Sequence, residues 1–472
     1  MKDLKKENVY LRPPIVVVLG HVDHGKTTLL DALRKTDVAA KEAGGITQSI
    51  GASQVTTREG KVVTFIDTPG HYTFAKMRSR GAKVADIAVL VIASEDGVKP
   101  QTEEALKYIK EAGIPMIVVA TKSDLASANP EMLRSQLTKL GINLEKSGGD
   151  TPFISVSARK GQGIEELLET ITLLSEVSEI KGDVNSNLDA VIIETGKDKR
   201  GTIISLIVKD GILSVGDEIA TDTSKAKVRG IFNYLGKQVK SIKPGEPGQV
   251  LGFSEPPQVG SRVWNIKNKD ILPITSKAKP LKIKETDEKV SLVLKASNAG
   301  ILEAILENLS KDVFVVSATV GDVNESDIFI AKSSGSRIFA FESKIGGSAS
   351  RLADTEGVLI ENFTIIYELF ERMDKIIDDG NVKVLGKAQI IQIFPYENKK
   401  VAGCRAISGE IAKNDDALVS RDNKEVGKVK IVSMKKGKID IEKVKQGEEF
   451  GVILAPQLEF KIGDVLSSVR NP

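Results

Sequence analysis

Cysteine and aromatic residues are scarce in this sequence of 472 residues. The single cysteine, Cys404, excludes an intramolecular disulfide bond and fits a reducing compartment, so we expect a cytoplasmic protein. Aromatic residues make up 4% of the chain, too few for a platform on which single-stranded nucleic acid would stack. Any contact with RNA should therefore rest on phosphates and on shape.

Long hydrophobic runs and a strong charge of one sign are also missing. The longest apolar runs, such as IVVVL and IAVLVIA, are far shorter than the roughly 20 residues that span a bilayer, and the N-terminus has no apolar signal segment. We therefore expect no membrane association. The net charge is +3, and residues 381–472 carry 17 lysines and arginines against 12 acidic residues. This local excess fits a solvated surface and an RNA-facing surface equally well.

The chain is long enough for several domains, because 472 residues exceed a single hydrophobic core. Residues 14–180 alternate short β-rich runs with segments of helical periodicity, which predicts an α/β domain with a parallel-rich sheet. Short strands between glycine and aspartate turns follow up to residue 269 and predict a small β-barrel. Residues 289–366 return to mixed strand and helix. Residues 364–379 have helical spacing and lead into a second β-rich segment.

The two β-rich segments resemble each other internally. The stretch LSVGDEI from Leu213 is echoed by IAKNDDA from Ile411, and PGEPGQVLG from Pro244 is echoed by QGEEFGVIL from Gln446. Both copies close on a similar turn and strand, QVGSRV and KIGDVL. These echoes predict two barrels of one kind. A stretch rich in lysine, proline and threonine, residues 267–289, is typical of a linker.

The stretch GHVDHGKT indicates the chemistry of the first domain. It fits the pattern G-x-x-x-x-G-K-[ST], follows an apolar strand and opens a helix, which is the context in which such a loop binds phosphates. We expect Lys26 to reach the β- and γ-phosphates and the hydroxyl of Thr27 to bind Mg²⁺. The predicted phosphate-binding residues are Asp23, His24, Gly25, Lys26, Thr27, Thr28 and, from a later loop, Gly70.

Two further stretches complete the phosphate end. In DTPGH, Asp67 can hold Mg²⁺ through its waters, and the Gly70 amide can meet the γ-phosphate. His71 can orient a water for in-line attack, the alternative being a surface histidine in a loop. In GGIT, residues 44–47, paired glycines indicate a mobile loop whose Thr47 binds Mg²⁺ only when the γ-phosphate is present. The predicted metal ligands are Thr27, Thr47 and Asp67.

The choice of base rests on TKSD, which follows the strand MIVVA. The carboxylate of Asp124 can accept from N1–H and the 2-amino group of guanine, which adenine does not offer, so the motif favours GTP over ATP. The stem of Lys122 can lie over the base, and Ser157-Ala158 can bring a backbone N–H to guanine O6. A helix N-cap is the alternative for Asp124 taken alone. The predicted guanine-binding residues are Thr121, Lys122, Asp124, Ser157 and Ala158.

The order of these motifs resembles that of the translational GTPases. RPPIVVVLGHVDHGKTTLLDALRKT, EAGGITQSIGA, DTPGHYTFAKMRSRGA and DGVKPQTEEA are similar to bacterial-type translation initiation factor two, and the likeness runs from about Arg12 to Val469. The resemblance implies a ribosome-activated GTPase that uses GTP, GDP and Mg²⁺, with His71 catalytic on the ribosome and Asp23 near a monovalent cation. It also implies a monomer that promotes subunit joining, with both ribosomal subunits and formylmethionyl initiator tRNA as partners.

The resemblance further implies a series of parts. These are a P-loop GTPase domain (12–180), a β-barrel (185–269), an α/β/α sandwich domain (287–365), a connecting helix (366–381) and a C-terminal β-barrel (382–472). We expect the long N-terminal extension of bacterial relatives to be lacking. In that family the terminal barrel holds the formylmethionyl end of the tRNA. Matching positions here are Cys404, Glu449, Phe450 and Gly451.

Two residues depart from the family pattern: Thr121 replaces an asparagine, and Phe450 replaces a cysteine. The first changes the guanine site, and the second either forms an apolar wall for the formylmethionyl group or closes its pocket. A second interpretation is a related translation factor of the elongation type. The GGITQ and RPP stretches argue against it. A third reading, from another class, is a nucleotide-gated scaffold that binds ribosomes and hydrolyses little GTP.

Overall fold

The computed structural model describes residues 9–36, 47–145, 148–266, 290–381, 383–396, 399–421, 424–437 and 439–470. The chain divides into two compact units, Met1–Phe370 and Glu371–Pro472. Residues 44–46 of the GGIT stretch and the predicted linker 267–289 lie outside the described residues. Within the described ranges, no helix is both long and apolar enough to cross a bilayer.

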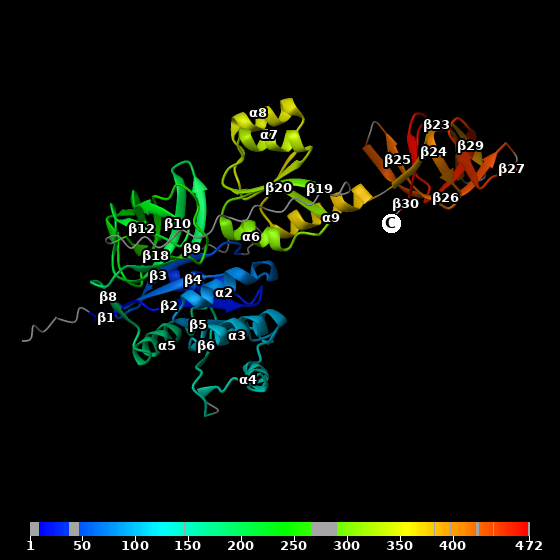
Figure 1. Ribbon diagram of the computed structural model, residues 1–472. Coiled ribbons are helices and arrows are strands. Elements are labelled where there is room, and N and C mark those ends of the chain that lie inside the picture. The colour runs from blue at the N-terminus through cyan, green and yellow to red at the C-terminus, as the bar shows by residue number, and fades with distance from the viewer. Residues whose placement is uncertain are drawn as a thin grey trace, which may run out of the picture. The chain divides into compact units, whose positions relative to one another are not determined.

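A six-stranded sheet with the order β3-β4-β2-β5-β6-β7 organises the first part of the chain (Figure 1). Its strands are β2 (Ile15–Gly20), β3 (Gly51–Thr56), β4 (Val62–Asp67), β5 (Ile87–Ala93), β6 (Met116–Thr121) and β7 (Phe153–Ser155). All neighbouring pairs are parallel except β3 with β4. Successive strands lie on both sides of β2, so its carboxyl end is the switch point where open α/β sheets bind ligands.

Helices cover both faces of this sheet, as the alternating sequence pattern predicts. Leucines of α1 (Lys26–Arg34) and α5 (Ile164–Val177) share one buried cluster with Val16 and Val89. On the other face, α2 (Ala75–Val84) and α3 (Pro100–Ala112) contact each other and β2. A further helix, α4 (Pro130–Lys139), precedes β7. The predicted parallel-rich α/β domain is therefore confirmed.

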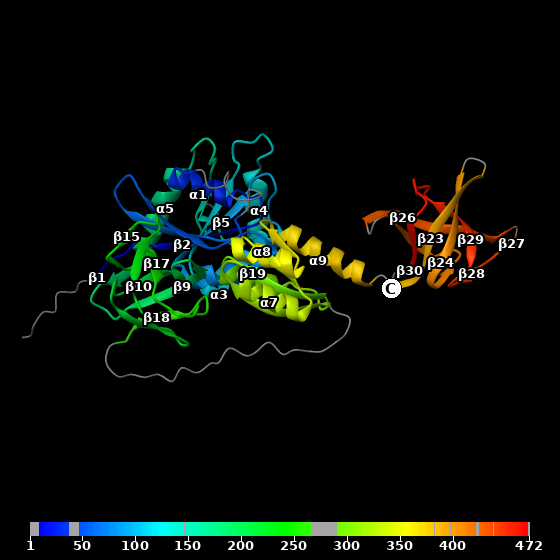
Figure 2. The ribbon, with the colours of Figure 1, turned by 90° about the horizontal axis from the view of Figure 1, so that it is seen from above.

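An antiparallel β domain follows, shown in green in Figure 2. The order of its main sheet is β13-β12-β18-β9-β10-β17-β14-β15, and β11 pairs with β16. Its strands are β9 (Asp189–Asp198), β10 (Gly201–Asp210), β11 (Leu213–Ser214), β12 (Glu218–Ala220), β13 (Lys225–Lys227), β14 (Gly230–Asn233), β15 (Gln238–Val239), β16 (Ser241–Ile242), β17 (Pro247–Leu251) and β18 (Arg262–Asn265). Ile192, Leu206 and Val250 lie in its buried core. A short pair, β1 (Val9–Leu11) with β8 (Lys181–Asp183), joins the chain before β2 to the segment after α5.

The third part is a parallel sheet between helices, with the strand order β20-β19-β21-β22. Its elements are β19 (Val290–Ala296), α6 (Ala299–Glu307), β20 (Val313–Val320), α7 (Glu325–Ser334), β21 (Arg337–Phe341), α8 (Gly347–Glu356) and β22 (Ile360–Phe363). Figure 1 shows α7 and α8 on one side of β19 and β20, and α6 on the other. This arrangement confirms the predicted α/β/α sandwich. Helix α9 (Ile366–Asn381) then leads to the second unit.

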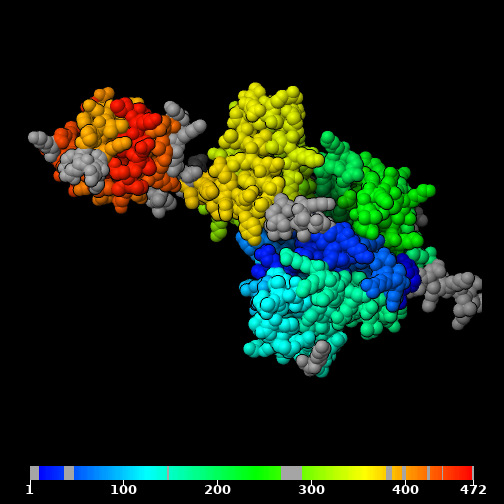
Figure 3. Space-filling model, turned by 180° about the vertical axis from the view of Figure 1, so that it is seen from behind, coloured from blue at the N-terminus to red at the C-terminus, as the bar shows by residue number. Residues whose placement is uncertain are grey.

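The second unit contains a closed β-barrel, orange to red in Figure 3. Its strands are β23 (Lys383–Tyr396), β24 (Lys399–Ala412), β25 (Asp416–Arg421), β26 (Lys424–Lys436), β27 (Ile439–Asp440), β28 (Lys443–Lys445), β29 (Glu449–Ala455) and β30 (Val465–Arg470). The path β23-β30-β25-β26-β29-β24 closes because β24 pairs back with β23. Ile390, Val419 and Leu466 lie in its buried core.

The turns of the two β-rich parts repeat at the spacing predicted from the sequence. The N–H of Ser214 donates to the side chain of Asp217 at 2.8 Å, and the N–H of Ala412 donates to Asp415 at 2.9 Å. In the second echo, Lys243 N–H donates to Glu246 at 2.9 Å, and Lys445 N–H donates to Glu448 at 2.8 Å. The internal repeat therefore reflects the same local hydrogen bonding in both parts.

Glu194 of β9 lies where the antiparallel domain meets α6. Its side chain is 7% exposed, and Oε1 accepts from the N–H groups of Thr195 at 2.7 Å and Gly300 at 3.1 Å. Among the described residues, Oε2 has no hydrogen-bond partner. Burial raises the pKa of Glu194 to about 7, although these N–H groups and the nearby Arg80 act in the opposite direction.

Candidate functional site

The loop between β2 and α1 has the backbone conformation of a phosphate cradle. Gly20, Asp23 and Gly25 have φ values of 152°, 64° and 83°, in a region that residues with a Cβ rarely adopt. A Cβ on Gly20 would lie 2.3 Å from the carbonyl oxygen of Val91, so the loop can pass β5 only as glycine. The strain is local to the predicted phosphate-binding stretch, as is common at functional sites.

Lys26 is held inside this loop. Its Nζ donates to the carbonyl oxygens of Gly20 at 3.0 Å and His21 at 2.6 Å. Burial lowers the pKa of Lys26 to about 8, while the carboxylate of Asp67 favours the charged form. A Cβ on Gly70 would lie 2.4 Å from Nζ, so the DTPG loop passes close to the lysine.

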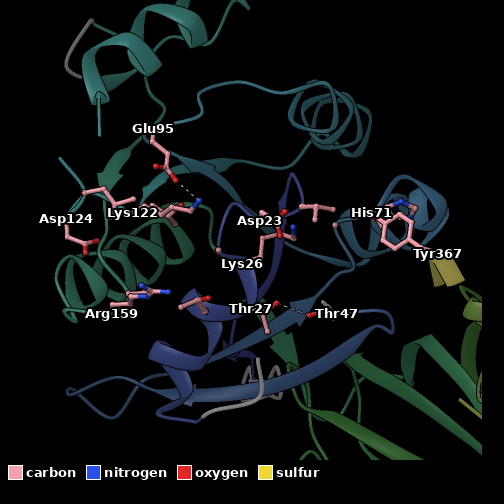
Figure 4. Close-up of a pocket in the computed structure, with 17 residues that line it drawn as sticks. Asp23, Lys26, Thr27, Thr47, His71, Glu95, Lys122, Asp124, Arg159 and Tyr367 are labelled. Carbon is pink, nitrogen blue, oxygen red and sulfur yellow. Dashed lines mark hydrogen bonds and ion pairs between the residues drawn. The ribbon is translucent and has the colours of Figure 1, made fainter. Parts of the chain in front are cut away.

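A cavity of about 410 Å³ opens beside this loop (Figure 4). The predicted residues that line it are Asp23, Gly25, Lys26, Thr27, Thr28, Thr47, Gly70, His71, Thr121, Lys122, Asp124 and Ala158. Figure 4 shows Asp124, Lys122 and Arg159 toward one end and His71 and Tyr367 at the other. Motifs separated by more than a hundred residues therefore meet in one hollow.

Three predicted residues do not line this cavity. The side chain of His24 is 1% exposed and packs edge to face on His21, with ring centroids 5.0 Å apart. Asp67 is 4% exposed at the end of β4, behind the cavity wall, and Ser157 is fully buried.

The predicted metal ligands fit a small, hard cation. The hydroxyls of Thr27 and Thr47 are hydrogen-bonded to each other at 2.9 Å, a separation that also suits two adjacent oxygens on an octahedral Mg²⁺ with bonds of about 2.1 Å. The carboxylate of Asp67 ends the neighbouring strand, at the position from which it could hold metal-bound water. Among the described residues, no group of three His, Cys, Asp or Glu side chains forms a metal site of its own, so the phosphates and water would supply the remaining ligands.

His71 lies at the phosphate end of the cavity in a nearly enclosed position. Its ring is 5% exposed, and Nδ1 is 2.7 Å from the hydroxyl of Thr73. Burial and the nearby Arg78 lower the pKa of His71 to about 4, so the imidazole is neutral at pH 7. The fully buried Arg78 donates to the carbonyl oxygens of Pro69, Gly70 and His71 and so fixes the loop that carries the histidine.

At the base end, Asp124 and Lys122 are each held by a neighbour. Asp124 accepts from the Ser157 hydroxyl at 2.7 Å, and this bond lowers the pKa of the carboxyl group. Lys122 has a φ of 55° and pairs with Glu95 at 2.7 Å. Thr121, the departure from the family pattern, donates instead to the carbonyl oxygen of His24 at 2.6 Å. Its hydroxyl thus ties β6 to the phosphate loop.

A second cavity, of about 760 Å³, lies in the terminal barrel and is lined by all four residues predicted there, Cys404, Glu449, Phe450 and Gly451. Gly403 of β24 and Gly451 of β29 face each other in register, and their missing side chains create the hollow. Phe394, which is 44% exposed, borders it, since its ring would lie 3.0 Å from a Cβ on Gly403.

Phe450 and Cys404 form the buried side of this second cavity. They are paired in register, are 4% and 1% exposed, and belong to the barrel core. Burial raises the pKa of the Cys404 thiol to about 12, so the cysteine is a neutral apolar residue. The bulk of Phe450 is thus directed into the core and leaves the cavity open. Glu449 pairs with Arg405 at 2.5 Å on the exposed rim.

Three known protein families match successive parts of the chain. Residues 12–176 match the elongation factor Tu GTP binding domain, 187–265 match elongation factor G domain 2, and 268–374 match translation-initiation factor 2. Translation initiation factor IF-2 of Thermus thermophilus is 39% identical over an alignment of 502 positions. The alignment covers 99% of this chain and 88% of that protein. The chain belongs to the translation initiation factor IF-2 family. The resemblance predicted from the motifs is confirmed.

Some members of the IF-2 family are much longer. IF-2 of Aquifex aeolicus is 39% identical over 96% of this chain, which spans only 60% of the length of that relative. The crystal structure of GDP-bound aIF5B from Aeropyrum pernix aligns with 98% of this chain and 92% of that chain, at 26% identity and a TM-score of 0.46.

Sequence reasoning missed several residues of the nucleotide cavity in this IF-2 family member. Besides Val22 and Leu125, these are Glu95, Arg159 and Tyr367. Arg159 directly follows the predicted Ser157-Ala158 pair, and this position was the only local signal for it. Glu95 lies two residues after the end of β5 and has no motif of its own. Tyr367 belongs to α9, some 300 residues from His71 in the chain, and nothing in the sequence pattern connects the two.

Proposed function

We propose that this chain binds GTP and GDP, hydrolyses GTP on the ribosome and acts as a translation initiation factor. The observation that carries the proposal is that phosphate-loop, Mg²⁺-binding, base-binding and histidine motifs line one cavity of about 410 Å³. Guanine is the base that Asp124 can recognise through N1–H and the 2-amino group, with the stem of Lys122 over the ring.

The phosphate end supplies positive charge and hydrogen-bond donors to the triphosphate. Lys26 Nζ would exchange its carbonyl partners for phosphate oxygens, which restores the solvation that its burial removed. Thr27, Thr47 and Asp67 would hold Mg²⁺, which neutralises charge on the β- and γ-phosphates when bound. Asp23, at the rim of the same cavity, would position a monovalent cation.

His71 would orient the attacking water. A neutral imidazole can accept a hydrogen bond from water at its free nitrogen while the other nitrogen is engaged by Thr73. Its lowered pKa ensures that it is not already protonated at pH 7. Hydrolysis then depends on placing this nitrogen in line with the γ-phosphate, a geometry that ribosome binding would complete.

The catalytic role is tested by His71→Ala with single-turnover hydrolysis of GTP in the presence of ribosomes. We expect a loss of about 10²- to 10⁴-fold with GDP affinity unchanged, which is the range for a positioned acid–base group. Lys83→Ala, on the exposed side of α2, is the matched control. If ribosome-stimulated turnover survives in His71→Ala, the chain is better described as a nucleotide-gated scaffold.

The terminal barrel is the proposed site for the formylmethionyl end of initiator tRNA. Gly403 and Gly451 form the floor of a recess that the exposed ring of Phe394 borders and that Gln392 and Glu449 also line. Lys435 also lines the recess, where it pairs with Asp440 at 3.5 Å and could turn toward a phosphate of the RNA. A recess with an apolar floor and polar groups beside it suits a formylmethionyl group, which has an apolar side chain and a polar formamide.

The proposed binding of initiator tRNA is tested by measuring how far the chain protects the aminoacyl ester against spontaneous hydrolysis. The full chain should protect formylmethionyl initiator tRNA and leave the unformylated form unprotected. Gly451→Val, which fills the floor of the recess, should abolish protection, whereas Ile462→Ala, at an exposed position of the same unit, should not. Equal protection of both tRNA forms would refute recognition of the formyl group.

A further inference from the structure

Tyr367, in the first turn of α9, lies at the phosphate end of the nucleotide cavity. It lines the cavity together with Asp23 and His71, and 42% of its surface is exposed. Its ring meets the imidazole of His71 edge to face, with centroids 4.3 Å apart and an angle of 71° between the rings (Figure 4). This contact joins the catalytic histidine of the proposed reaction to the helix that follows the α/β/α sandwich.

The first turn of α9 is also held from the GGIT side. Gln48, the residue after Thr47, is 4% exposed, and its Oε1 accepts from the N–H of Ile366 at 3.1 Å. The Nε2 of Gln48 donates to the carbonyl oxygen of Thr364 at 2.7 Å and to Glu342 at 3.3 Å. The oxygen of this buried amide thus caps the start of α9, and its nitrogen holds the residues just before the helix, immediately beside a predicted metal ligand.

The imidazole of His71 is consequently enclosed by its neighbours. The ring of Tyr72 lies at a centroid distance of 4.1 Å, that of Tyr367 at 4.3 Å, and the hydroxyl of Thr73 occupies Nδ1. Tyr367 also occupies part of the cavity at the phosphate end, where the imidazole and an attacking water need room. The docked α9 therefore holds the histidine in a resting position.

We propose that Tyr367 is a positioning residue for hydrolysis, whose ring restrains His71 until the first turn of α9 moves away. The inference rests on the proposed catalytic role of His71. It assigns to the first turn of α9 a direct restraint on the reaction. Gln48 joins the same first turn of α9 to the segment that follows Thr47.

The expected effect of Tyr367 on the rate of hydrolysis follows from its contact with His71. An edge-to-face aromatic pair changes a conformational equilibrium by about two- to tenfold. Removing the Tyr367 ring should therefore raise the slow hydrolysis of GTP by the free protein about two- to tenfold. A general defect in folding or binding would lower this rate, so an increase distinguishes a restraint from a merely structural role.

The experiment compares the intact wild-type chain with Tyr367→Leu and the neighbouring control Glu368→Ala. Because Tyr367 is partly exposed, the leucine variant should fold. Single-turnover hydrolysis of GTP is measured without ribosomes, and the dissociation constant of GTP is measured separately. We expect Tyr367→Leu to hydrolyse GTP about two- to tenfold faster at an unchanged dissociation constant, and Glu368→Ala to match the wild type.

A second readout follows the contact itself. The chain has three histidines, so ¹³C-labelled imidazole groups give a simple NMR spectrum, which His71→Gln assigns. The His71 resonance should shift in Tyr367→Leu, which removes the ring current of Tyr367 and leaves that of Tyr72, and should keep its wild-type position in Tyr367→Phe, which retains the ring. An unshifted resonance, or an unchanged or slower rate in Tyr367→Leu, overturns the proposal. If instead the proposed function is wrong, ribosomes will not stimulate the hydrolysis of GTP by the wild-type chain.

Discussion

Replacing Glu194 by glutamine tests the energetic cost of burying its carboxyl group where the antiparallel domain meets α6. In the folded chain the pKa of this carboxyl group is about 7, against 4.5 for an exposed glutamate. Between these two values the folded state binds more protons than the unfolded state, so stability falls as the pH rises. At about 1.36 kcal/mol for each pH unit, the loss amounts to about 3 kcal/mol between pH 4.5 and pH 7 and above.

The assay is urea unfolding at several pH values, followed by the fluorescence of Trp264, the single tryptophan, which lies in β18 of the same domain. The glutamine variant lacks the titration, so its stability relative to wild type should improve by about 3 kcal/mol from pH 4.5 to pH 8. Comparing the two pH values cancels any pH-independent change in stability that comes from replacing the carboxyl group by an amide. Glu255→Gln, at an exposed position of the same domain, should follow the wild type. A pH-independent difference between Glu194→Gln and wild type would refute the reasoning.

Three further predictions concern the nucleotide cavity. Gly70→Ala puts a Cβ 2.4 Å from Lys26 Nζ and should weaken GTP binding about tenfold, as measured with a fluorescent nucleotide. Arg78→Met removes the donor to three loop carbonyls and should lower the free energy of unfolding by about 3 kcal/mol in a urea titration. Thr121→Val loses the hydrogen bond to the His24 carbonyl and should weaken GDP binding about fivefold. Thr121→Ser keeps the hydroxyl and should bind GDP like the wild type. Equal GDP affinities of the two variants would show that this hydrogen bond does not support the nucleotide site.

The principal elements could be predicted because their signals are local. IVVVLG and IAVLVIA are apolar over their whole length, and both became fully buried central strands, β2 and β5. The antiparallel strand β3 was missed because GASQVT lies at the edge of the sheet and has few apolar residues. The repeated turns at Asp217 and Asp415 were detectable because each hydrogen bond spans only three residues.

The sequence by itself determined the phosphate loop, the DTPGH and TKSD stretches and the family, because each depends on the order of neighbouring residues. Only the tertiary structure decided which distant groups meet. It brought Tyr367 onto His71, capped α9 with Gln48 and buried Glu194 deeply enough to raise its pKa. Such contacts and pKa values depend on packing and desolvation, which arise between residues hundreds of positions apart and leave no pattern along the chain.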